Sequence, residues 1–290
     1  MRMPLVYVLV LNYRAWQDTV ACLRALERLK YPNYQIVVLD NASNNDSATQ
    51  IRQRYPTVEL LELPHNLGFA GGNNVGIRRA LAAGAEYVWL LNPDTLPDCG
   101  ALTPLVELAE SDPHIGAVGS ILLEMDHPER IQAWGGGQVL LNWGMIRLLT
   151  SSHQAKALSY ISGASLLIRR AALERVGLLD EGFFMYAEDA DYGLRLTKAG
   201  FKLAVAEGSR VLHRGGTSWV KEHLSADENF AAYNIRLFRK HSPQPLLASA
   251  FYCIFWLLEY SLRRRWASIG ALWRGVRKGW QLGASQQGRF

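Results

Sequence analysis

Short apolar runs alternate with amphipathic stretches along the first 95 residues of the chain. Residues 5–11 form a continuous run rich in Val and Leu, which is typical of a strand buried on both faces of a parallel sheet. Residues 15–30 instead place apolar side chains at helical spacing. The alternation continues, with strands expected at 35–39, 58–63 and 86–91 and with helices expected from Asp46 and at 68–83. It predicts an α/β fold with a doubly wound, mostly parallel, Rossmann-like sheet, whose ligands bind beyond the carboxyl ends of the strands.

The pattern changes after a further strand expected at 115–122. Residues 124–158 show little periodicity and contain three consecutive glycines and two tryptophans, so we expect a mobile loop or a small subdomain. Regular structure then returns, with strands expected at 159–169 and 201–212 and with helices expected at 171–176, 190–199 and 226–240. Two prolines, Pro243 and Pro245, mark a boundary, and residues 243–290 are expected to form a helical attachment.

The composition and charge narrow the class of protein. With 49% hydrophobic and 20% charged residues, the chain is neither disordered nor collagenous nor a polytopic membrane protein. Of 31 basic and 26 acidic residues, seven basic and one acidic lie in residues 243–290, so the rest of the chain is nearly neutral. We therefore expect no nucleic-acid partner. Three widely spaced cysteines indicate neither a disulfide framework nor a zinc site, and fit a reducing compartment.

Polar residues follow the expected strands at the edge where ligands bind. Asn12, Asp40, Asn66 and Asp94 all stand at these carboxyl ends. Asp40 could accept hydrogen bonds from a nucleoside or could cap the next helix. The Asn92-Pro93-Asp94 sequence puts a carboxylate where it can bind a hard cation that bridges a diphosphate, although Asx-Pro-Asp is also a common turn signature.

Residues 65–74 combine small residues with asparagines at the point where a loop enters a helix. Bare backbone N–H groups near Gly71 and Asn74, together with the positive end of the helix dipole, could bind an anionic ligand. The segment matches neither the Walker spacing nor a GxGxxG fingerprint. Close helix packing with asparagine caps is the alternative.

Three acidic residues, Glu188, Asp189 and Asp191, stand at the start of an expected helix, directly after an aromatic stretch. Acidic residues favour helix N-termini because of the dipole, and Asp191 is spaced to pair with Arg195. Asp189 and Asp191 lie about 200° apart around a helix, so they cannot both face one site. One carboxylate could therefore be a general base and the other structural.

A histidine, His213, ends the strand expected at 201–212. A lone histidine is more often a structural group than a ligand. If it faced Asp94 across a cleft, the two would form a mixed nitrogen and oxygen site suited to Mn²⁺ or Mg²⁺.

Together these segments resemble one family. The chain is similar to family 2 glycosyltransferases of the GT-A fold, and most similar to their bacterial rhamnosyltransferase branch. The resemblance covers residues 5–240 and follows the family's order. It is carried by VLNY (10–13), VLDNAS (38–43), NLGFAGGNN (66–74), LLNPDT (90–95), SGASLLIRR (162–170), FFMYAEDAD (183–191) and VLH (211–213).

The resemblance implies a role for each matching residue. Asp40 reads the nucleotide base or ribose, Asp94 supplies the metal-binding carboxylate of the family's DXD motif, and Asp189 is the catalytic base. His213 is implied as a metal or diphosphate ligand. Asn92 replaces the first acid of DXD, which leaves the number of protein metal ligands open.

The remaining site residues follow from their segments. The donor site is expected to include Asn12, Asn66, Gly71, Asn74 and Asn92. Residues 124–158 are expected to choose the acceptor, with Trp134 and Glu188 as candidates on the acceptor side.

We therefore expect an inverting, metal-dependent glycosyltransferase with Mn²⁺ or Mg²⁺ as cofactor. It would move a sugar from a nucleoside diphosphate donor, with dTDP-rhamnose as the best candidate, onto a lipid-linked or polysaccharide acceptor. One base implies a single displacement with inversion. The catalytic domain would span residues 1–242, with a nucleotide-sugar half over 1–121 and an acceptor and catalytic-base half over 122–242.

Three alternatives stay open at this point. The enzyme could transfer a hexosyl or galactofuranosyl group from a UDP-sugar. The chain could instead be a catalytically silent module that binds nucleotides or glycans. A nucleotidyltransferase is the third, although it would need a glycine-rich loop directly after the first strand, where the sequence is Asn12-Tyr13-Arg14. An oligomer is possible in each case.

The attachment over residues 243–290 has the composition of a membrane-surface anchor. Its uncharged stretch, residues 246–258, is shorter than the ~20 residues needed to span a bilayer. Arginines follow, with Trp266, Trp273 and Trp280 at seven-residue spacing, which is typical of a segment drawn to anionic lipid. We expect a cytoplasmic protein bound peripherally to the inner face of the cell membrane. A core or dimer helix with a basic outer face is the alternative.

Overall fold

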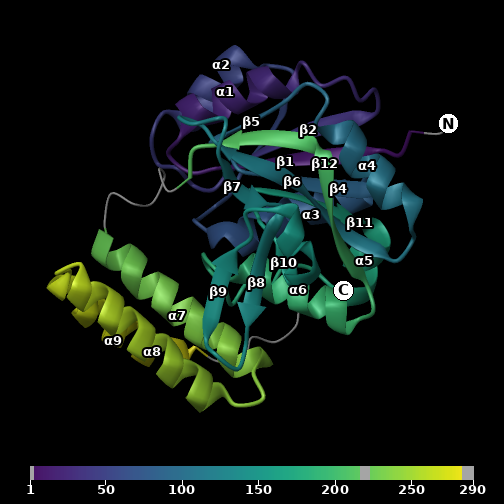
Figure 1. Cartoon of the computed structure of the whole chain (residues 1–290). Coiled ribbons are helices and arrows are strands. Elements are labelled where there is room, and N and C mark those ends of the chain that lie inside the picture. Colours follow the sequence, from purple (N-terminus) through teal and green to yellow (C-terminus); the bar gives the residue numbers. More distant parts are fainter. Residues whose placement is uncertain (1–2, 216–222, 283–290) are drawn as a thin grey trace.

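The structure, a computed structural model, describes residues 3–215 and 223–282 (Figure 1). Within these residues, nine strands form one mixed sheet in the order β3-β2-β1-β4-β11-β6-β12-β5, with β7 paired to β6. Parallel pairing joins β1 to β2 and β4, β2 to β3, and β6 to β12, whereas β11 runs antiparallel to both β4 and β6. The strands of the first part are β1 (Val6–Asn12), β2 (Tyr34–Asp40), β3 (Glu59–Glu62), β4 (Tyr87–Leu91), β5 (Thr95–Pro97) and β6 (Ile115–Glu124). The predicted α/β sheet is confirmed.

Helices cover both faces of this sheet because successive strand residues point to opposite sides. Val8 and Val10 of β1 belong to a core that includes residues of α1, α2 and α4, whereas Leu9 belongs to the opposite core with α3, α5 and α6. Burial on both sides explains why the strands read as continuous apolar runs. These helices are α1 (Trp16–Leu26), α2 (Ser47–Arg54), α3 (Gly68–Ala82), α4 (Leu102–Ser111), α5 (Arg170–Val176) and α6 (Glu188–Lys198).

Two elements, β5 and α4, were not predicted from the sequence pattern. β5 is three residues long, contains Pro97 and pairs antiparallel with β12 (Lys202–His213) at the edge of the sheet. Proline is tolerated on an edge strand because no further ladder needs its missing N–H group. The short strand nevertheless brings the residues around Asp94 beside the end of β12.

Residues 124–158 form a small subdomain and not a mobile loop. They contain β7 (Ile131–Trp134), β8 (Gly136–Leu140), β9 (Met145–Leu148) and the 3₁₀ helix η1 (Ser152–Ala157), and β8 pairs with β9 and β10 (Tyr160–Ile161) in a separate three-stranded sheet. A Cβ atom at Gly136 would collide with the carbonyl oxygen of Tyr160. Glycine is therefore needed for a close strand approach here, and this glycine run hid the strand pattern from the sequence analysis.

The single strand expected at 159–169 is two strands in different sheets. β10 lies in the small sheet, and β11 (Ser165–Arg169) lies between β4 and β6 in the large one. Ser162 donates its backbone N–H to Gly135, and Ser165 donates its own to Ser162, so a turn separates the strands. This turn faces the pocket described below.

The C-terminal segment forms three helices in a separate layer beside β8 and β9 (Figure 1). They are α7 (His223–His241), α8 (Pro245–Leu262) and α9 (Trp266–Gln281), and they share one hydrophobic cluster. The expected boundary at residue 243 is the turn between α7 and α8. Because α8 and α9 cover the buried side of α7, the attachment is not an independent unit. Residues 283–290, part of the expected attachment, lie outside the described residues.

α8 is long and apolar enough to cross a membrane by length and composition alone, and no other helix among residues 3–215 and 223–282 passes that test. Its 18 residues have a mean hydropathy of 1.4, and 28% of them are buried. The expectation that this segment is too short to span a bilayer is therefore not supported by its length. Whether α8 crosses a bilayer or lies on its surface must therefore be judged from the residues that α8 packs against.

Candidate active site

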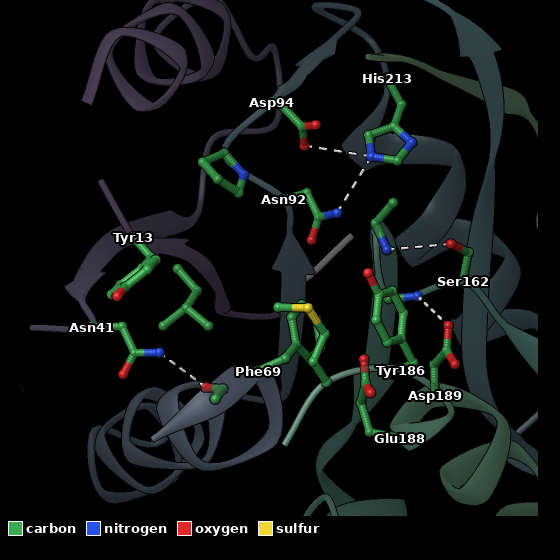
Figure 2. Close-up of a pocket in the computed structure, with 16 residues that line it drawn as sticks. Tyr13, Asn41, Phe69, Asn92, Asp94, Ser162, Tyr186, Glu188, Asp189 and His213 are labelled. Atoms are coloured by element: carbon green, nitrogen blue, oxygen red, sulfur yellow. Dashed lines mark hydrogen bonds and ion pairs between the residues drawn. The ribbon is translucent and has the colours of Figure 1, made fainter. Parts of the chain in front are cut away.

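A pocket of about 250 Å³ lies at the carboxyl ends of β1, β2 and β4 (Figure 2). The starts of α3 and α6, the 162–164 turn and the end of β12 complete its wall. It is lined by Leu11, Tyr13, Asn41, Gly68, Phe69, Asn92, Pro93, Asp94, Ser162, Gly163, Ala164, Met185, Tyr186, Glu188, Asp189 and His213. Five residues singled out in the sequence therefore meet here, namely Asn92, Asp94, Glu188, Asp189 and His213.

The turn after β4 holds Asn92 and Asp94 in the pocket wall. Asn92 donates its backbone N–H to the carbonyl of Ala164 at 3.1 Å, and the Thr95 hydroxyl donates to the Asn92 carbonyl at 2.6 Å. Beneath this turn, burial raises the pKa of the Cys22 thiol to about 12, so the thiol stays protonated. The Asn-Pro-Asp sequence thus forms a turn and also presents a carboxylate to the pocket.

His213 faces Asp94 in this pocket, as Figure 2 shows. Its Nε2 lies 3.4 Å from Asp94 Oδ1 and 3.4 Å from the amide nitrogen of Asn92, and its Nδ1 lies 2.6 Å from Gln132 Oε1. With the Gln132 oxygen as acceptor, Nδ1 carries the hydrogen and Nε2 presents its lone pair. This lone pair can accept the Asn92 amide N–H, and it stands beside the Asp94 carboxylate, where it can also bind a cation.

The Asp94 and His213 pair suits a divalent cation. Carboxylate oxygen and neutral imidazole nitrogen are both ligands of Mn²⁺, and Gln132 fixes the ring as outer partners of metal-binding histidines do. Among the described residues, no group of three His, Cys, Asp or Glu side chains could hold a metal ion. A cation here would therefore depend on further oxygen ligands from a bound diphosphate or water.

Asp189 enters the pocket from the first turn of α6. The two residues before this helix, Tyr186 and Ala187, have φ values of 73° and 64°, a left-handed conformation that is uncommon outside glycine. The Asp189 carboxylate accepts the backbone N–H of Gly163 at 3.0 Å and that of Ala190 at 2.8 Å. These bonds fix the carboxylate against the 162–164 turn, which is how the break between β10 and β11 serves the site.

Burial separates the proton affinities of Glu188 and Asp189. Burial raises the pKa of Asp189, and the backbone N–H groups of Gly163 and Ala190 oppose that rise. Burial and the charge of Asp189 raise the pKa of Glu188 well above its usual range, and among the described residues its Oε2 has no hydrogen-bond partner. Burial and the neighbouring charge therefore favour the protonated form of Glu188, whereas two backbone N–H groups favour the carboxylate form of Asp189.

Asp191 lies outside the pocket and is fully buried. Its carboxylate lies 2.7 Å from Arg195 Nε, 2.7 Å from Lys240 Nζ and 2.7 Å from His241 Nε2. Burial alone would raise the pKa of Asp191, but these three partners outweigh it and hold that pKa below its usual range. The prediction that Asp189 and Asp191 cannot face one site is confirmed, and Asp191 joins α6 to the end of α7.

Asn12 and Asp40 were expected to touch the donor, but neither lines the pocket. Asn12 donates its amide N–H to Asp40 Oδ1 at 2.6 Å, and Ser43 donates its backbone N–H to Asp40 Oδ2 at 3.1 Å. Asp40 is only 4% exposed. The neighbouring Asn41, which the sequence analysis did not select, lines the pocket instead.

The start of α3 is not the bare anion site that the sequence suggested. Leu67 donates its backbone N–H to Asn41 Oδ1 at 2.8 Å, Gly68 to Asn66 Oδ1 at 2.9 Å, and Phe69 to the carbonyl of Phe184 at 2.7 Å. Protein groups thus use the N–H groups that a ligand would need. The alternative of asparagine caps is confirmed.

Gly71 and Asn74 also lie outside the pocket lining. Asn74 is buried and binds the backbone of Leu179 through both ends of its amide, at 2.9 and 3.1 Å. Trp134, expected on the acceptor side, belongs to β7 and pairs with Ile121 of β6. None of these three residues therefore lines the pocket.

Sequence reasoning missed the apolar part of the wall, which includes Tyr13, Phe69, Met185 and Tyr186. All four stand within or beside the motif segments, but the motifs were examined only for polar chemistry. Gly68 was missed as well, although its φ of 71° and its contact with Phe184 hold α3 against the 183–187 segment. The aromatic residues next to the polar motifs were the sequence signal that could have predicted this apolar wall.

Comparison with known proteins places these features in a family. The Glycosyl transferase family 2 pattern matches residues 7–177. The N-acetylglucosaminyl-diphospho-decaprenol L-rhamnosyltransferase of Mycobacterium tuberculosis is 32% identical over 217 residues, which cover 66% of this chain and 71% of that protein. The galactofuranosyltransferase GlfT1 of Mycolicibacterium smegmatis is 27% identical over 281 residues, covering 85% of this chain and 88% of that protein.

A solved structure supports the fold. The mannosyltransferase PcManGT of Pyrobaculum calidifontis, solved with GDP-Man and Mn²⁺, has a TM-score of 0.64 at 17% identity and covers 97% of this chain and 88% of that one. With the family pattern and the relatives above, the conclusion is that this chain belongs to glycosyl transferase family 2, as a rhamnosyltransferase-like enzyme of the GT-A fold.

Proposed function

We propose that the protein is an inverting, cation-dependent glycosyltransferase that moves L-rhamnose from dTDP-rhamnose onto a lipid-linked or polysaccharide acceptor of the cell envelope. The observation that carries the proposal is one pocket that combines the Asp189 carboxylate with the facing Asp94 and His213 side chains. The Asp189 carboxylate can act as the base, and the Asp94 and His213 side chains can bind the cation at the diphosphate end of a donor. The rhamnosyl group and the lipid-linked acceptor follow the name of the M. tuberculosis relative.

The reaction would be a single displacement. The acceptor hydroxyl oxygen forms a bond to the anomeric carbon, Asp189 takes the hydroxyl proton, and the bond from that carbon to the diphosphate oxygen breaks with its electron pair. The diphosphate leaves with the added charge. Because Asp189 is held by two backbone N–H groups, its carboxylate is oriented before the acceptor arrives.

Asp94 and His213 would hold the divalent cation, Mn²⁺ or Mg²⁺. When bound, it would supply positive charge that stabilises the departing diphosphate. The backbone N–H groups at the start of α3 are already used, so they add little to this stabilisation. The negative charge of the departing diphosphate would therefore be stabilised mainly by the cation that Asp94 and His213 hold.

The two halves of the chain would divide the work. Residues 1–121 supply Asn41 and Asp94 on the donor side, and residues 122–242 supply Asp189, Glu188 and the small sheet on the acceptor side. We further propose that the enzyme works in the cytoplasm at the inner face of the cell membrane, where a lipid-linked acceptor is found. Residues 243–290 would form the attachment that keeps it there.

A donor panel tests this proposal. Purified enzyme is incubated with dTDP-rhamnose, UDP-galactofuranose, UDP-glucose and GDP-mannose, with Mn²⁺ or with a chelator, and nucleotide release and thermal shift are recorded. We expect the largest metal-dependent shift and release with dTDP-rhamnose. A shift with no release under any acceptor would instead support a silent binding module.

A second candidate is galactofuranosyl transfer from a UDP donor. The match to GlfT1 favours it because that alignment covers 85% of this chain, against 66% for the rhamnosyltransferase match. Preference for UDP-galactofuranose in the same panel would select this candidate.

A further inference from the structure

α8 is apolar on its exposed side as well as on its buried side. Ile254, Leu258 and Leu262 are 54%, 60% and 81% exposed, whereas Tyr252 and Tyr260 are buried. Surface helices usually turn their apolar stripe to the core. The exposed stripe is uncharged over its whole length, so water is not its expected surroundings.

A different part of the chain extends this stripe. Trp143, in the turn between β8 and β9, is 59% exposed, and its ring centroid lies 5.2 Å from that of Phe251 on α8. The next residue, Gly144, packs directly against the backbone carbonyl of Ala248. The small sheet and α8 therefore present one continuous apolar surface.

Positive charge borders the apolar surface. Arg263, Arg264 and Arg265 form the turn from α8 to α9, and α9 adds exposed Arg277 next to exposed Trp273. Along α8 and α9 the single acidic residue is Glu259, which pairs with Arg263, and Asp227 of α7 pairs with Arg265 at 2.7 Å. All three arginines of the turn are nevertheless exposed. A basic edge beside an apolar face with tryptophans matches the headgroup region of an anionic bilayer.

We propose that the exposed side of α8, Trp143 and the arginines of the α8–α9 turn form one docking surface for an anionic lipid bilayer. The surface differs from the regular tryptophan repeat noted in the sequence, because Trp280 is covered by Arg239 at 5.1 Å. α8 lies along the bilayer without crossing it, since its other side packs in one cluster with α7 and α9. A crossing helix would have to leave that cluster.

This docking surface rests on the proposed function and gives it a geometry. The ring of Tyr186 in the pocket wall contacts Phe230 of α7 at 5.6 Å, and Phe230 contacts Trp256 of α8 at 5.8 Å between centroids. The pocket wall is thus two ring contacts away from the docking helix.

Vesicle flotation of the full-length protein tests the surface without any sugar donor. The vesicles are phosphatidylcholine alone and phosphatidylcholine with phosphatidylglycerol, each at low and high salt. Ile254→Gln/Leu258→Gln removes two exposed apolar side chains of α8, and Leu148→Gln is its control, because Leu148 is exposed at the end of β9 away from the turn that meets α8. Arg264→Gln/Arg277→Gln removes charge, with Arg28→Gln/Lys30→Gln on the far side of the protein as its control.

We expect wild type to float with the anionic vesicles. Losing each arginine should weaken binding about fivefold at low salt and less at high salt. The α8 variant should weaken it at least about tenfold at either salt, and both controls should bind as wild type does. Unchanged thermal unfolding shows that each variant is folded.

Three results would overturn the proposal. In the first, wild type floats with neither vesicle. In the second, binding survives both variants. In the third, the vesicle-bound protein resists alkaline extraction, as a protein with a spanning helix does. A dimer that the α8 variant dissociates in the absence of lipid would assign the surface to a second copy. Because no donor is present, failure here leaves the donor panel informative, and an inactive donor panel leaves this binding result intact.

Discussion

Nε2 of His213 lies 3.4 Å from Oδ1 of Asp94, and the short ladder between β5 and β12 puts them there. In that ladder His213 stands directly opposite Thr95, the residue after Asp94. A three-residue edge strand therefore aligns the end of β12 with the turn after β4. The two side chains are brought together by backbone pairing before any ligand arrives.

This relationship predicts that Asp94→Asn and His213→Gln both abolish cation-dependent donor binding. Each removes one of two facing ligands, so transfer should fall by roughly 10²-fold or more. Thermal unfolding of each variant is measured with and without Mn²⁺ and nucleotide, alongside activity. A variant that unfolds normally without ligand but shows no shift with Mn²⁺ and nucleotide is folded and has lost donor binding. Asp98→Asn, an exposed carboxylate close by in sequence, is the matched control and should shift as wild type does. A full Mn²⁺-dependent shift in folded Asp94→Asn would show that the cation is bound elsewhere.

The rate should depend on the protonation of Asp189. A general base works only when deprotonated, so kcat falls as pH falls, and burial places the midpoint above the usual range for an aspartate. Asp189→Asn should lower kcat by about 10²-fold or more while leaving donor affinity within a few fold.

The Glu188→Gln variant tests whether Asp189, and not the neighbouring Glu188, is the general base. Burial and the charge of Asp189 raise the pKa of Glu188, so the uncharged amide resembles the protonated form that burial favours, and kcat at neutral pH should stay within several fold of wild type. A pH–rate profile of both variants checks this. If Glu188→Gln were as inactive as Asp189→Asn, Glu188 would be the base.

Asp191→Asn should damage stability more than chemistry. It removes the charge that Arg195, Lys240 and His241 surround in a fully buried position, so we expect a loss of about 3 kcal/mol in the free energy of unfolding. Glu174→Gln, which breaks the exposed pair with Arg170, is the control and should cost under about 1 kcal/mol. Urea unfolding compares the two.

The same carboxylate predicts a pH dependence of stability. The folded pKa of Asp191 is below its unfolded value, so its contribution is present above the unfolded pKa near 3.8 and is lost as pH falls through the folded pKa. Wild type should therefore lose stability in this acid range more steeply than Asp191→Asn does. Parallel curves for the two proteins would contradict the assignment.

Gly68→Ala should disturb both fold and activity. The position has a φ of 71°, and a Cβ atom would collide with the carbonyl of Phe184, which holds the 183–187 segment. Gly84→Ala is a matched control, since Gly84 has a φ of 82° with open space around it. Left-handed strain alone costs about 1 kcal/mol. We expect Gly68→Ala to lose more stability than Gly84→Ala, and to lower kcat/KM where the control does not.

The sequence by itself determined the α/β sheet, most of its strands along the chain and several residues that line the pocket. Continuous apolar runs such as residues 5–11 predicted buried strands because a two-sided environment leaves no polar position in them. Strand-end motifs predicted Asn92 and Asp94 for the same topological reason, since carboxyl ends of parallel strands meet at one edge. Asp189 was predicted separately, from the acidic start of the helix that follows an aromatic stretch. The 200° separation between Asp189 and Asp191 followed from helix geometry alone.

Only the tertiary structure decided which polar groups remain available to a ligand. Asn12, Asp40, Asn66 and Asn74 have the right residue type, but protein partners already occupy them, and partners far apart in sequence leave no local pattern. The same holds for β5, too short to show a period, and for the small sheet, whose glycines pack against distant backbone. The outward apolar face of α8 was likewise invisible, because a helix with apolar residues all round gains a direction only from what packs against it.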